Sequence, residues 1–295
     1  MSSEYQSLPS ATRQAAMSAA EALAPEQSVD EVRESLSVTE KGQPANTIGN
    51  CRTVFCHDPL LRDAIRLNLL TDRVDIVRDL GWRRNTSALT DTDVKYLLLY
   101  FEQTYGLTSE KKMTAALSIV ANENCYHPIQ DVLNGLVWDG TPRIRSCLHH
   151  FLGADESDYV EEMLKHFLLG AIRRVFSPGS KYEEMLCLVG GQGAGKSSFF
   201  RLLAIRDEWF SDDLKKLDDD RVFLKLQGHW IIEMSEMLAT SSAKSIEEIR
   251  SFISRQKETY RTPYEAQPKD RLRQCVFGGS SNTLDFLPLD RAGNR

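Results

Sequence analysis

Apolar residues recur at helical spacing in three stretches of the first two thirds of the chain, at residues 91–102, 109–122 and 159–176. Asp91 and Asp93 begin the first stretch and Ser109 precedes the second, as helix N-termini prefer. The third and longest stretch ends just before Pro178-Gly179, a pair that stops helices. A strand pair is a further expectation, between residues 68 and 82. We therefore expect residues 46–180 to form a mostly helical accessory domain.

The remaining residues, 181–295, have a different pattern, in which short apolar runs of strand length alternate with helical stretches. The predicted strands are residues 184–189, 229–234 and 274–280, and the predicted helices are residues 196–204, 218–226 and 244–257. Such alternation is typical of an α/β fold, in which a parallel sheet lies between helices and the functional loops follow the carboxyl ends of the strands. We therefore predict a three-layer α/β domain over residues 181–295.

Composition limits this picture further. The chain has 295 residues, of which 41% are hydrophobic and 26% charged, and a net charge of −6, as in soluble globular proteins. No apolar stretch approaches the roughly 18 residues that cross a bilayer, and the N-terminus lacks the layout of a secretory signal. We expect a cytoplasmic protein with no membrane contact. Residues 1–45 are rich in Ala, Ser, Glu and Gln and poor in apolar residues, which predicts a mobile leader.

Residues 190–197 read Gly-Gly-Gln-Gly-Ala-Gly-Lys-Ser and match the Gly-x-x-x-x-Gly-Lys-Ser phosphate-binding loop. The apolar run at 185–189 precedes the loop and a predicted helix follows it, which is the context that the motif requires. Glycines let backbone N–H groups approach phosphates, and a helix N-terminus adds partial positive charge. The sequence therefore predicts a nucleoside triphosphate site formed by Gly190, Gly191, Gln192, Gly193, Ala194, Gly195, Lys196, Ser197 and Ser198.

Polar residues at the ends of two later strands complete the predicted site. Glu233 ends the second predicted strand, where a nucleotide hydrolase needs a carboxylate to hold Mg²⁺ and to orient the attacking water. Ser197 is the second expected Mg²⁺ ligand, and Lys196 is expected to neutralise the β- and γ-phosphates. Glu236 either polarises water or caps the next helix. Asn282, after the third predicted strand, either contacts the γ-phosphate or forms a turn.

Three further features bear on the nucleotide and its surroundings. The chain lacks the Asn-Lys-x-Asp guanine signature, which favours ATP, and it lacks the His-Arg-Asp and Asp-Phe-Gly motifs of protein kinases. Arg291 and Arg295 are each either an arginine finger, which acts on the nucleotide of a neighbouring subunit, or a surface arginine. Basic residues outnumber acidic ones at 250–273, which indicates a confined anion-binding patch or a solvated helix face.

Seven segments form a wider pattern: His127-Pro-x₄-Leu133, Trp138-Asp-Gly-Thr-Pro-Arg143, Phe176-Ser-Pro-Gly-Ser-Lys181, Gly190–Ser197, Gly228-His-Trp-Ile-Ile-Glu-Met-Ser-Glu236, Tyr260-Arg-Thr-Pro-Tyr264 and Asp290-Arg-Ala-Gly-Asn-Arg295. Together they resemble the virulence-associated protein E family of phages, prophages and pathogenicity islands, which is related to superfamily 3 helicases. The resemblance covers residues 46–295. It implies a P-loop NTPase domain of the AAA+ and superfamily 3 helicase-like type at 181–295. It also implies a ring-forming ATPase that acts in the replication of a mobile element.

The resemblance also implies roles for single residues. Lys196 and Ser197 form the family's first motif, Glu233 the second, and Asn282 the sensor, while Arg295 becomes the better arginine-finger candidate. Arg255, Lys257 and Arg261 fall where related helicases contact DNA. The resemblance further implies a homo-oligomer, a hexameric ring by analogy. Because relatives continue past the last segment with another arginine, an aromatic residue and helices, we expect a C-terminally truncated core.

The leading hypothesis is an ATP-hydrolysing, DNA-acting motor of a mobile genetic element. Its cofactors are ATP and Mg²⁺, and its partner is single-stranded or origin DNA. A second hypothesis is a nucleotide-switched interaction or defence protein, which binds ATP, oligomerises and signals without unwinding DNA. A third is a binding-only remnant that does not hydrolyse ATP.

Overall fold

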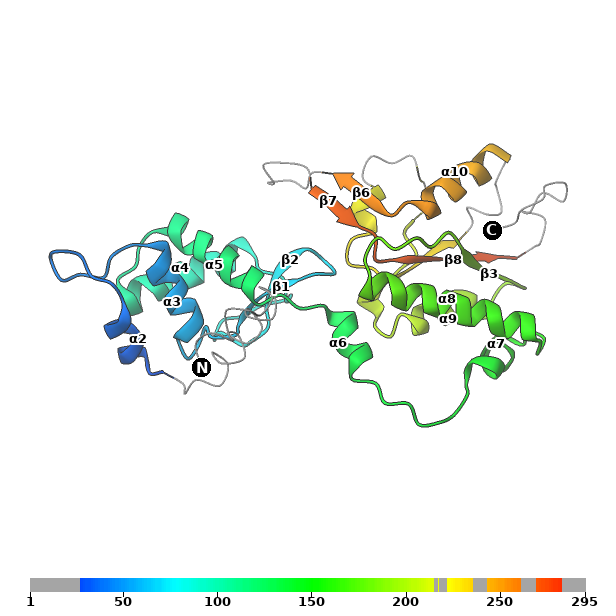
Figure 1. Cartoon of the computed structure of the whole chain (residues 1–295), viewed down its shortest axis with the longest axis horizontal. Helices are drawn as coiled ribbons and strands as arrows, with labels where there is room; N and C mark the ends of the chain where they lie inside the picture. The colour runs from blue at the N-terminus through cyan, green and yellow to red at the C-terminus, as the bar shows by residue number, and fades with distance from the viewer. Residues whose placement is uncertain (1–26, 215–216, 218–221, 236–242, 261–268, 283–295) are drawn as a thin grey trace, which may run out of the picture. The chain divides into compact units, whose positions relative to one another are not determined.

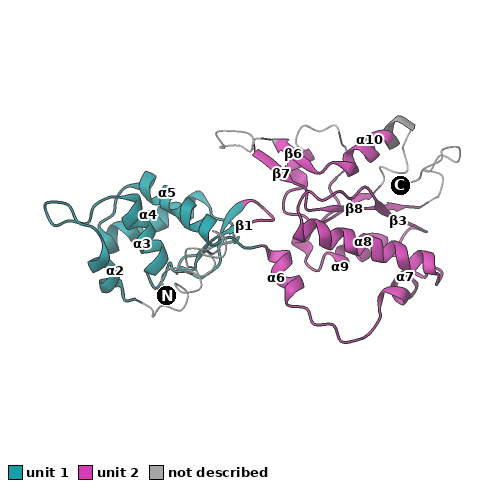
Figure 2. Cartoon of the chain, in the orientation of Figure 1, with its two compact units in different colours: residues 1–68, 73–126 teal, residues 69–72, 127–295 magenta. Residues whose placement is uncertain are grey.

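The computed structural model describes residues 27–214, 217, 222–235, 243–260 and 269–282 (Figure 1). The chain divides into two compact units (Figure 2). Unit 1 comprises residues 1–68 and 73–126, and unit 2 comprises residues 69–72 and 127–295. Among the helices that the structure describes, none is both long enough and apolar enough to cross a membrane.

Unit 1 is helical with one short antiparallel strand pair. Its elements are α2 (Val29–Ser35), α3 (Ile48–His57), β1 (Ile65–Asn68), β2 (Arg73–Ile76), α4 (Asp91–Tyr105) and α5 (Glu110–Glu123). The apolar faces of α3 and α4 meet in its core, where the ring centroids of Phe55 and Phe101 lie 4.9 Å apart. The helices predicted at 91–102 and 109–122 are confirmed as α4 and α5, and a strand pair forms close to the predicted place.

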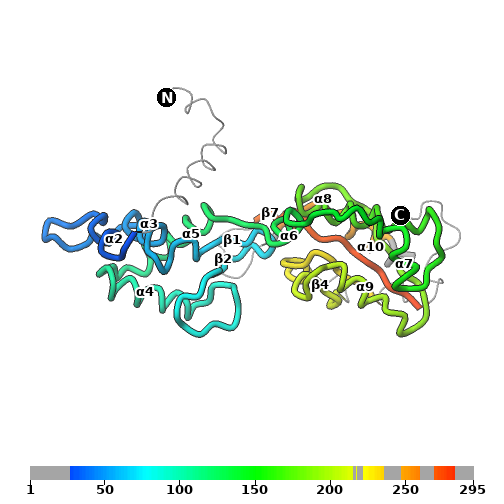
Figure 3. The backbone as a smooth tube through the Cα atoms, turned by 90° about the horizontal axis from the view of Figure 1, so that it is seen from below, coloured from blue at the N-terminus to red at the C-terminus, as the bar shows by residue number. Residues whose placement is uncertain are grey.

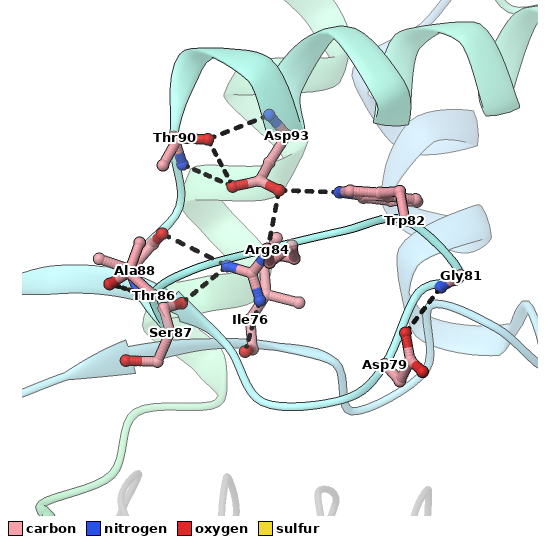
Figure 4. A network of polar contacts seen from close by, with 10 residues as sticks. All are labelled: Ile76, Asp79, Gly81, Trp82, Arg84, Thr86, Ser87, Ala88, Thr90 and Asp93. Atoms are coloured by element: carbon pink, nitrogen blue, oxygen red, sulfur yellow. Dashed lines mark hydrogen bonds and ion pairs between the residues drawn. The ribbon is translucent and has the colours of Figure 1, made fainter.

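A polar network fixes the start of α4 (Figure 4). Thr90 and Asp93 form a capping box, in which each side chain accepts a hydrogen bond from the other's backbone N–H. Asp93 Oδ1 also accepts from Trp82 Nε1 at 2.8 Å and from Arg84 Nε at 2.9 Å. Burial by itself would raise the pKa of Asp93, but the hydrogen bonds from Trp82, Thr90 and Arg84 outweigh it and lower that pKa. The network ties the preceding loop to the helix.

Residues 27–45 differ from the predicted mobile leader. A capping box between Ser28 and Glu31 begins α2, and Val32 and Leu36 are buried in the core of unit 1. Two apolar side chains four residues apart dock this short helix, although the average composition of the segment is polar. The rest of the predicted leader, residues 1–26, lies outside the described residues.

Unit 2 contains a four-stranded parallel sheet with the strand order β3–β8–β5–β4. Its helices and strands are α6 (Pro128–Asn134), α7 (Ile144–Leu152), α8 (Asp158–Phe176), β3 (Met185–Val189), α9 (Lys196–Leu203), β4 (Phe210–Ser211), β5 (Ile231–Ser235), α10 (Ala243–Ser254), β6 (Lys257–Tyr260), β7 (Lys269–Leu272) and β8 (Val276–Ser281), with short 3₁₀ helices at Asp207–Trp209 and Val222–Lys225. The three strands predicted from apolar runs are confirmed as β3, β5 and β8.

Helices cover both faces of this sheet (Figure 1). Phe167 of α8 and Phe200 of α9 pack on one face with Ile231, whereas Phe252 of α10 packs on the other with Ile232. Consecutive residues of β5 thus serve opposite faces, as the alternation of a strand requires. Figure 3 looks from below, the side of α8 and α9, and the red trace of β8 is seen between these two helices. The predicted α/β class is confirmed.

The boundary between the units lies after residue 126, whereas the sequence pattern placed it near residue 180. The long helix α8 belongs to unit 2 because Phe167, Ala171 and Val175 are buried in the core on its sheet. Arg174, also fully buried, donates to the main-chain oxygens of Tyr182 and Cys275 and ties α8 to the sheet. Helical spacing reveals an apolar face but not the core in which that face is buried.

Two predicted helices of unit 2 also differ from the structure. The helix predicted at 244–257 ends at Ser254, and β6 begins three residues later and pairs antiparallel with β7. Of the helix predicted at 218–226, residues 222–225 form a 3₁₀ helix, and residues 218–221 lie outside the described part of the chain. The β6–β7 hairpin was not predicted, because its strands carry charged residues in place of an apolar run.

Candidate functional site

A glycine-rich loop, residues 190–195, lies at the carboxyl edge of the parallel sheet, between β3 and α9. Gly193 and Gly195 have φ angles of 81° and 83°, a conformation that only glycine adopts readily. The first N–H groups of a helix have no acceptor within it, so the N-terminus of α9, which begins at Lys196, offers donors on the loop side. Loop and helix start together suit an anion.

Lys196 connects this loop to the end of β8. Its Nζ donates to the main-chain oxygens of Gly190 at 2.6 Å and Gly191 at 2.9 Å, and to Asn282 Oδ1 at 3.2 Å. The predicted sensor and the predicted phosphate-binding lysine are therefore in contact, although 86 positions separate them in the sequence. The adjacency of β3 and β8 in the sheet brings about this contact.

Glu233 of β5 is fully buried beside the start of α9. Its Oε1 accepts hydrogen bonds from Ser197 Oγ at 2.8 Å and from Ser280 Oγ at 2.5 Å. Its Oε2 is also buried and has no hydrogen-bond partner among the described residues. Leaving a buried carboxylate oxygen unpaired costs at least about 1–3 kcal/mol. Oε2 is therefore the atom of this site that most needs a ligand.

These oxygens have the character of a hard-cation site. Ser197 and Glu233 supply a hydroxyl and a carboxylate, the donor types that Mg²⁺ accepts. Within the described residues, no group of three or more His, Cys, Asp and Glu side chains is arranged to hold a metal ion. A cation here would need further oxygens from water or from a bound phosphate, as Mg²⁺ usually does.

A glycine of β8 lets α9 approach the sheet at this point. Gly278 lies opposite Glu233 in the β5–β8 register. A Cβ atom at position 278 would stand 2.5 Å from the ring of Phe200, one turn after Ser197 in α9. The absence of a side chain at 278 therefore sets the depth of α9, and with it the distance between Ser197 and Glu233.

Sequence reasoning selected neither Gly278 nor Ser280. The alternation of β8 places both residues on the same face of the sheet as each other. They lie close to Glu233 because of the register in which β5 pairs with β8. These two strands are far apart in the sequence, so no local pattern reveals their register. The only local signal was their place just before Asn282 in the same apolar run.

Glu236, Arg261, Arg291 and Arg295 lie outside the described residues, so their roles stay predictions. Ser198 is exposed in the first turn of α9.

The two described residues of the predicted DNA patch have carboxylate partners. Arg255 Nη1 lies 3.8 Å from Glu258 Oε2, and Lys257 Nζ lies 2.5 Å from Asp270 Oδ2 across the β6–β7 hairpin. Glu258 is further paired with Arg273, and both side chains are buried. The hairpin therefore carries its basic residues largely paired with acidic ones.

Fold and site define unit 2 as an α/β domain with a glycine-rich loop and a buried carboxylate at the carboxyl edge of a parallel sheet. The chain belongs to the virulence-associated protein E-like family, whose domain model matches residues 133–295, more than half of the chain. The family is associated with phages and prophages, and the resemblance seen in the sequence is confirmed.

Comparison with other proteins adds structures but no curated relative. No curated protein matches the chain. Among solved structures, the A form apo structure of the NrS-1 C-terminal region is 14% identical, with a TM-score of 0.41, over 74% of this chain and 53% of that one. The apo structure of the same NrS-1 region is also 14% identical, with a TM-score of 0.41, over 74% and 54%. The chain spans about half the length of these matched chains.

Proposed function

We propose that unit 2 is a P-loop ATPase core of the AAA+ and superfamily 3 helicase-like type, acting on DNA in the replication of a phage or another mobile element. The observation that carries the proposal is the contact of Ser197 with Glu233, 36 positions away, at 2.8 Å. It joins the glycine-rich loop to a buried carboxylate, the pairing that phosphoryl transfer needs.

The loop residues Gly190–Ser198 would hold the phosphates of ATP. Lys196 Nζ now donates to loop carbonyl oxygens and to Asn282. In the nucleotide complex Nζ would exchange carbonyl oxygens for the more strongly charged phosphate oxygens. Asn282 would then be free to orient the γ-phosphate or the attacking water.

Mg²⁺ fits the donors at the base of the loop. Ser197 Oγ and the unpaired Glu233 Oε2 would hold it, and when bound it would neutralise the charge of the β- and γ-phosphates. Glu233 would also orient the attacking water. Glu236 is the second candidate for that task, and Arg295, ahead of Arg291, is the proposed arginine finger from a neighbouring subunit of a homo-oligomer.

For the DNA-acting part, we propose that the β6–β7 hairpin contacts the phosphate backbone through Arg255, Lys257 and Arg261. Lys257 and Asp270 are both about half exposed. Such surface ion pairs contribute little free energy, so a phosphate can replace Asp270 as the partner of Lys257.

The same ion pairs favour a second candidate function. Since Arg255 and Lys257 already have carboxylate partners, the hairpin need not carry DNA. Unit 2 would then act as an ATP-switched, oligomerising interaction or defence protein without unwinding. DNA-stimulated ATP turnover would favour the motor, and ATP-driven assembly indifferent to DNA would favour the switch.

ATP turnover and ATP binding, each measured with and without single-stranded DNA, test the proposal. Lys196→Ala is expected to lose nucleotide affinity, and Glu233→Gln to bind ATP but lose turnover. Lys165→Ala, which removes an exposed lysine of α8 paired with Glu162, is the matched control and should behave as wild type. Wild-type ATP affinity in Lys196→Ala would contradict the assigned site.

A further inference from the structure

Ser280 is buried in β8 and makes the second hydrogen bond to Glu233. We propose that Ser280 is a positioning residue, which holds Glu233 so that Oε2 faces the cation and the attacking water. This inference rests on the proposed ATPase function and names a residue on which that function depends.

The two oxygens of Glu233 have different environments. Oε1 accepts both hydroxyl hydrogen bonds, at 2.8 Å and 2.5 Å, and Oε2 accepts none among the described residues. Hydroxyl–carboxylate bonds of 2.5–2.7 Å are short and charge-assisted. With Oε1 held in this way, the carboxylate cannot turn to pair Oε2 with either hydroxyl. One oxygen fixes the group and the other remains open for a ligand.

The two serines are not equivalent. Ser197 lies in the first turn of α9, and its hydroxyl is also the proposed Mg²⁺ ligand, so its contact with Glu233 depends on what the loop binds. Ser280 lies in β8, which β3 and β5 flank on either side. Its backbone is opposite Leu188 in one neighbour and Ser235 in the other. Ser280 is thus the donor whose position does not depend on the nucleotide.

Removing the Ser280 hydroxyl should therefore weaken cation binding and leave the phosphate cradle intact. Hydrogen bonds to charged groups correspond to about 10- to 100-fold in an equilibrium constant. We expect Ser280→Ala to raise the Mg²⁺ concentration for half-maximal binding of a non-hydrolysable ATP analogue by that factor. Affinity for the analogue in the presence of EDTA should not change. In turnover, kcat should fall more than KM rises.

Three variants make the experiment specific. Ser280→Thr keeps the hydroxyl and should restore the Mg²⁺ dependence. Ser280→Cys keeps the volume without a strong donor, and it replaces Ser280→Ala if that variant melts early. Ser211→Ala removes a buried hydroxyl from β4 of the same sheet, whose Oγ accepts a hydrogen bond from the backbone N–H of the nearby Asp213, and should match wild type.

A double variant separates positioning from folding. In the Glu233→Ala background, adding Ser280→Ala should weaken the Mg²⁺-dependent binding no further, because the group that Ser280 holds is already lost. An additive loss, or a wild-type Mg²⁺ dependence in Ser280→Ala, would overturn the positioning role. A wild-type chain that binds no ATP analogue would overturn the ATPase proposal itself, a distinct result.

Discussion

At the scale of single residues, the site depends on a position without a side chain. Gly278 lies opposite Glu233, and the ring of Phe200 fills the space where a Cβ atom would stand. Phe200 is one turn from Ser197 in α9. How closely Phe200 packs on the sheet therefore sets the distance between Ser197 and Glu233. A glycine within a strand costs backbone entropy. At position 278 it is needed because any side chain there would keep α9 from packing closely on the sheet.

Gly278→Ala is therefore expected to destabilise unit 2 by about 1–3 kcal/mol through overpacking and to lower Mg²⁺-dependent ATP affinity. Urea unfolding and binding of an ATP analogue measure the two effects. Adding Phe200→Leu should recover part of the loss, because the shorter side chain vacates that space. Gly135→Ala, where a Cβ makes only ordinary contacts of 3.5 Å, is the control. Equal effects of the two glycine substitutions would refute the packing argument.

At the scale of elements, α4 shows how one carboxylate serves two purposes. Asp93 closes the capping box with Thr90 and accepts from Trp82 and Arg84 of the preceding loop (Figure 4). Both purposes need the deprotonated carboxylate, because its two oxygens then accept hydrogen bonds. The lowered pKa of Asp93 favours this form. The neighbouring Asp91 is exposed in the first turn of α4, where an acidic side chain interacts favourably with the helix dipole.

Asp93→Ala should cost unit 1 about 2–4 kcal/mol, since it breaks the capping box and leaves Trp82 Nε1 and Arg84 Nε without their acceptor. Asp91→Ala should cost at most about 0.5 kcal/mol. Urea unfolding followed by tryptophan fluorescence compares the pair. A similar cost for both variants would mean that the loop contacts contribute nothing.

His127, the N-cap residue of α6, predicts that the stability of the protein depends on pH. Burial lowers the pKa of His127, and the hydrogen bond to Gln274 only partly opposes it. The unfolded chain therefore binds a proton near pH 6.5 that the folded chain does not, and stability falls as the pH drops through that value, by up to about 1.4 kcal/mol per pH unit. His127→Asn keeps a capping residue and should reduce the slope between about pH 7.5 and 5.5, and His229, whose pKa burial also lowers, supplies the remainder. The exposed His150→Asn should leave it unchanged, and an equally steep dependence in both variants would exclude His127 as its source.

Elements whose signal is local were predictable, and pairings between distant segments were not. The glycine-rich loop and the strands β3, β5 and β8 followed from short apolar runs and turn residues. The β6–β7 hairpin was missed because residues 257–260 are polar and follow a helical pattern directly. Ser280 was missed because its partner Glu233 lies 47 positions away, in a register that no local pattern encodes. The boundary between the units differs from the predicted one, because helical spacing shows that α8 has an apolar face but not in which core that face is buried.

At the scale of the whole molecule, the chain has a net charge of −6, and the described cations Arg255 and Lys257, at and just before β6, are paired with carboxylates. A protein that coats nucleic acid carries unpaired basic surface. The proposed DNA contact would therefore be confined and would compete with the protein's own carboxylates. Whether Lys257 binds a DNA phosphate or stays paired with Asp270 therefore distinguishes the DNA-acting motor from the ATP-driven switch.

The double variant Arg255→Ala with Lys257→Ala should weaken binding of single-stranded DNA and reduce the slope of log affinity against log salt by about two. Asp270→Asn should act in the opposite direction, because it releases Lys257 from its carboxylate, and should strengthen binding most at low salt. Lys165→Ala on α8 controls for a general loss of positive charge. Fluorescence anisotropy across a salt series measures all three variants. Opposite shifts from the hairpin variants require DNA at the hairpin and favour the motor, whereas unchanged slopes in both would leave the hairpin a paired surface and favour the ATP-driven switch.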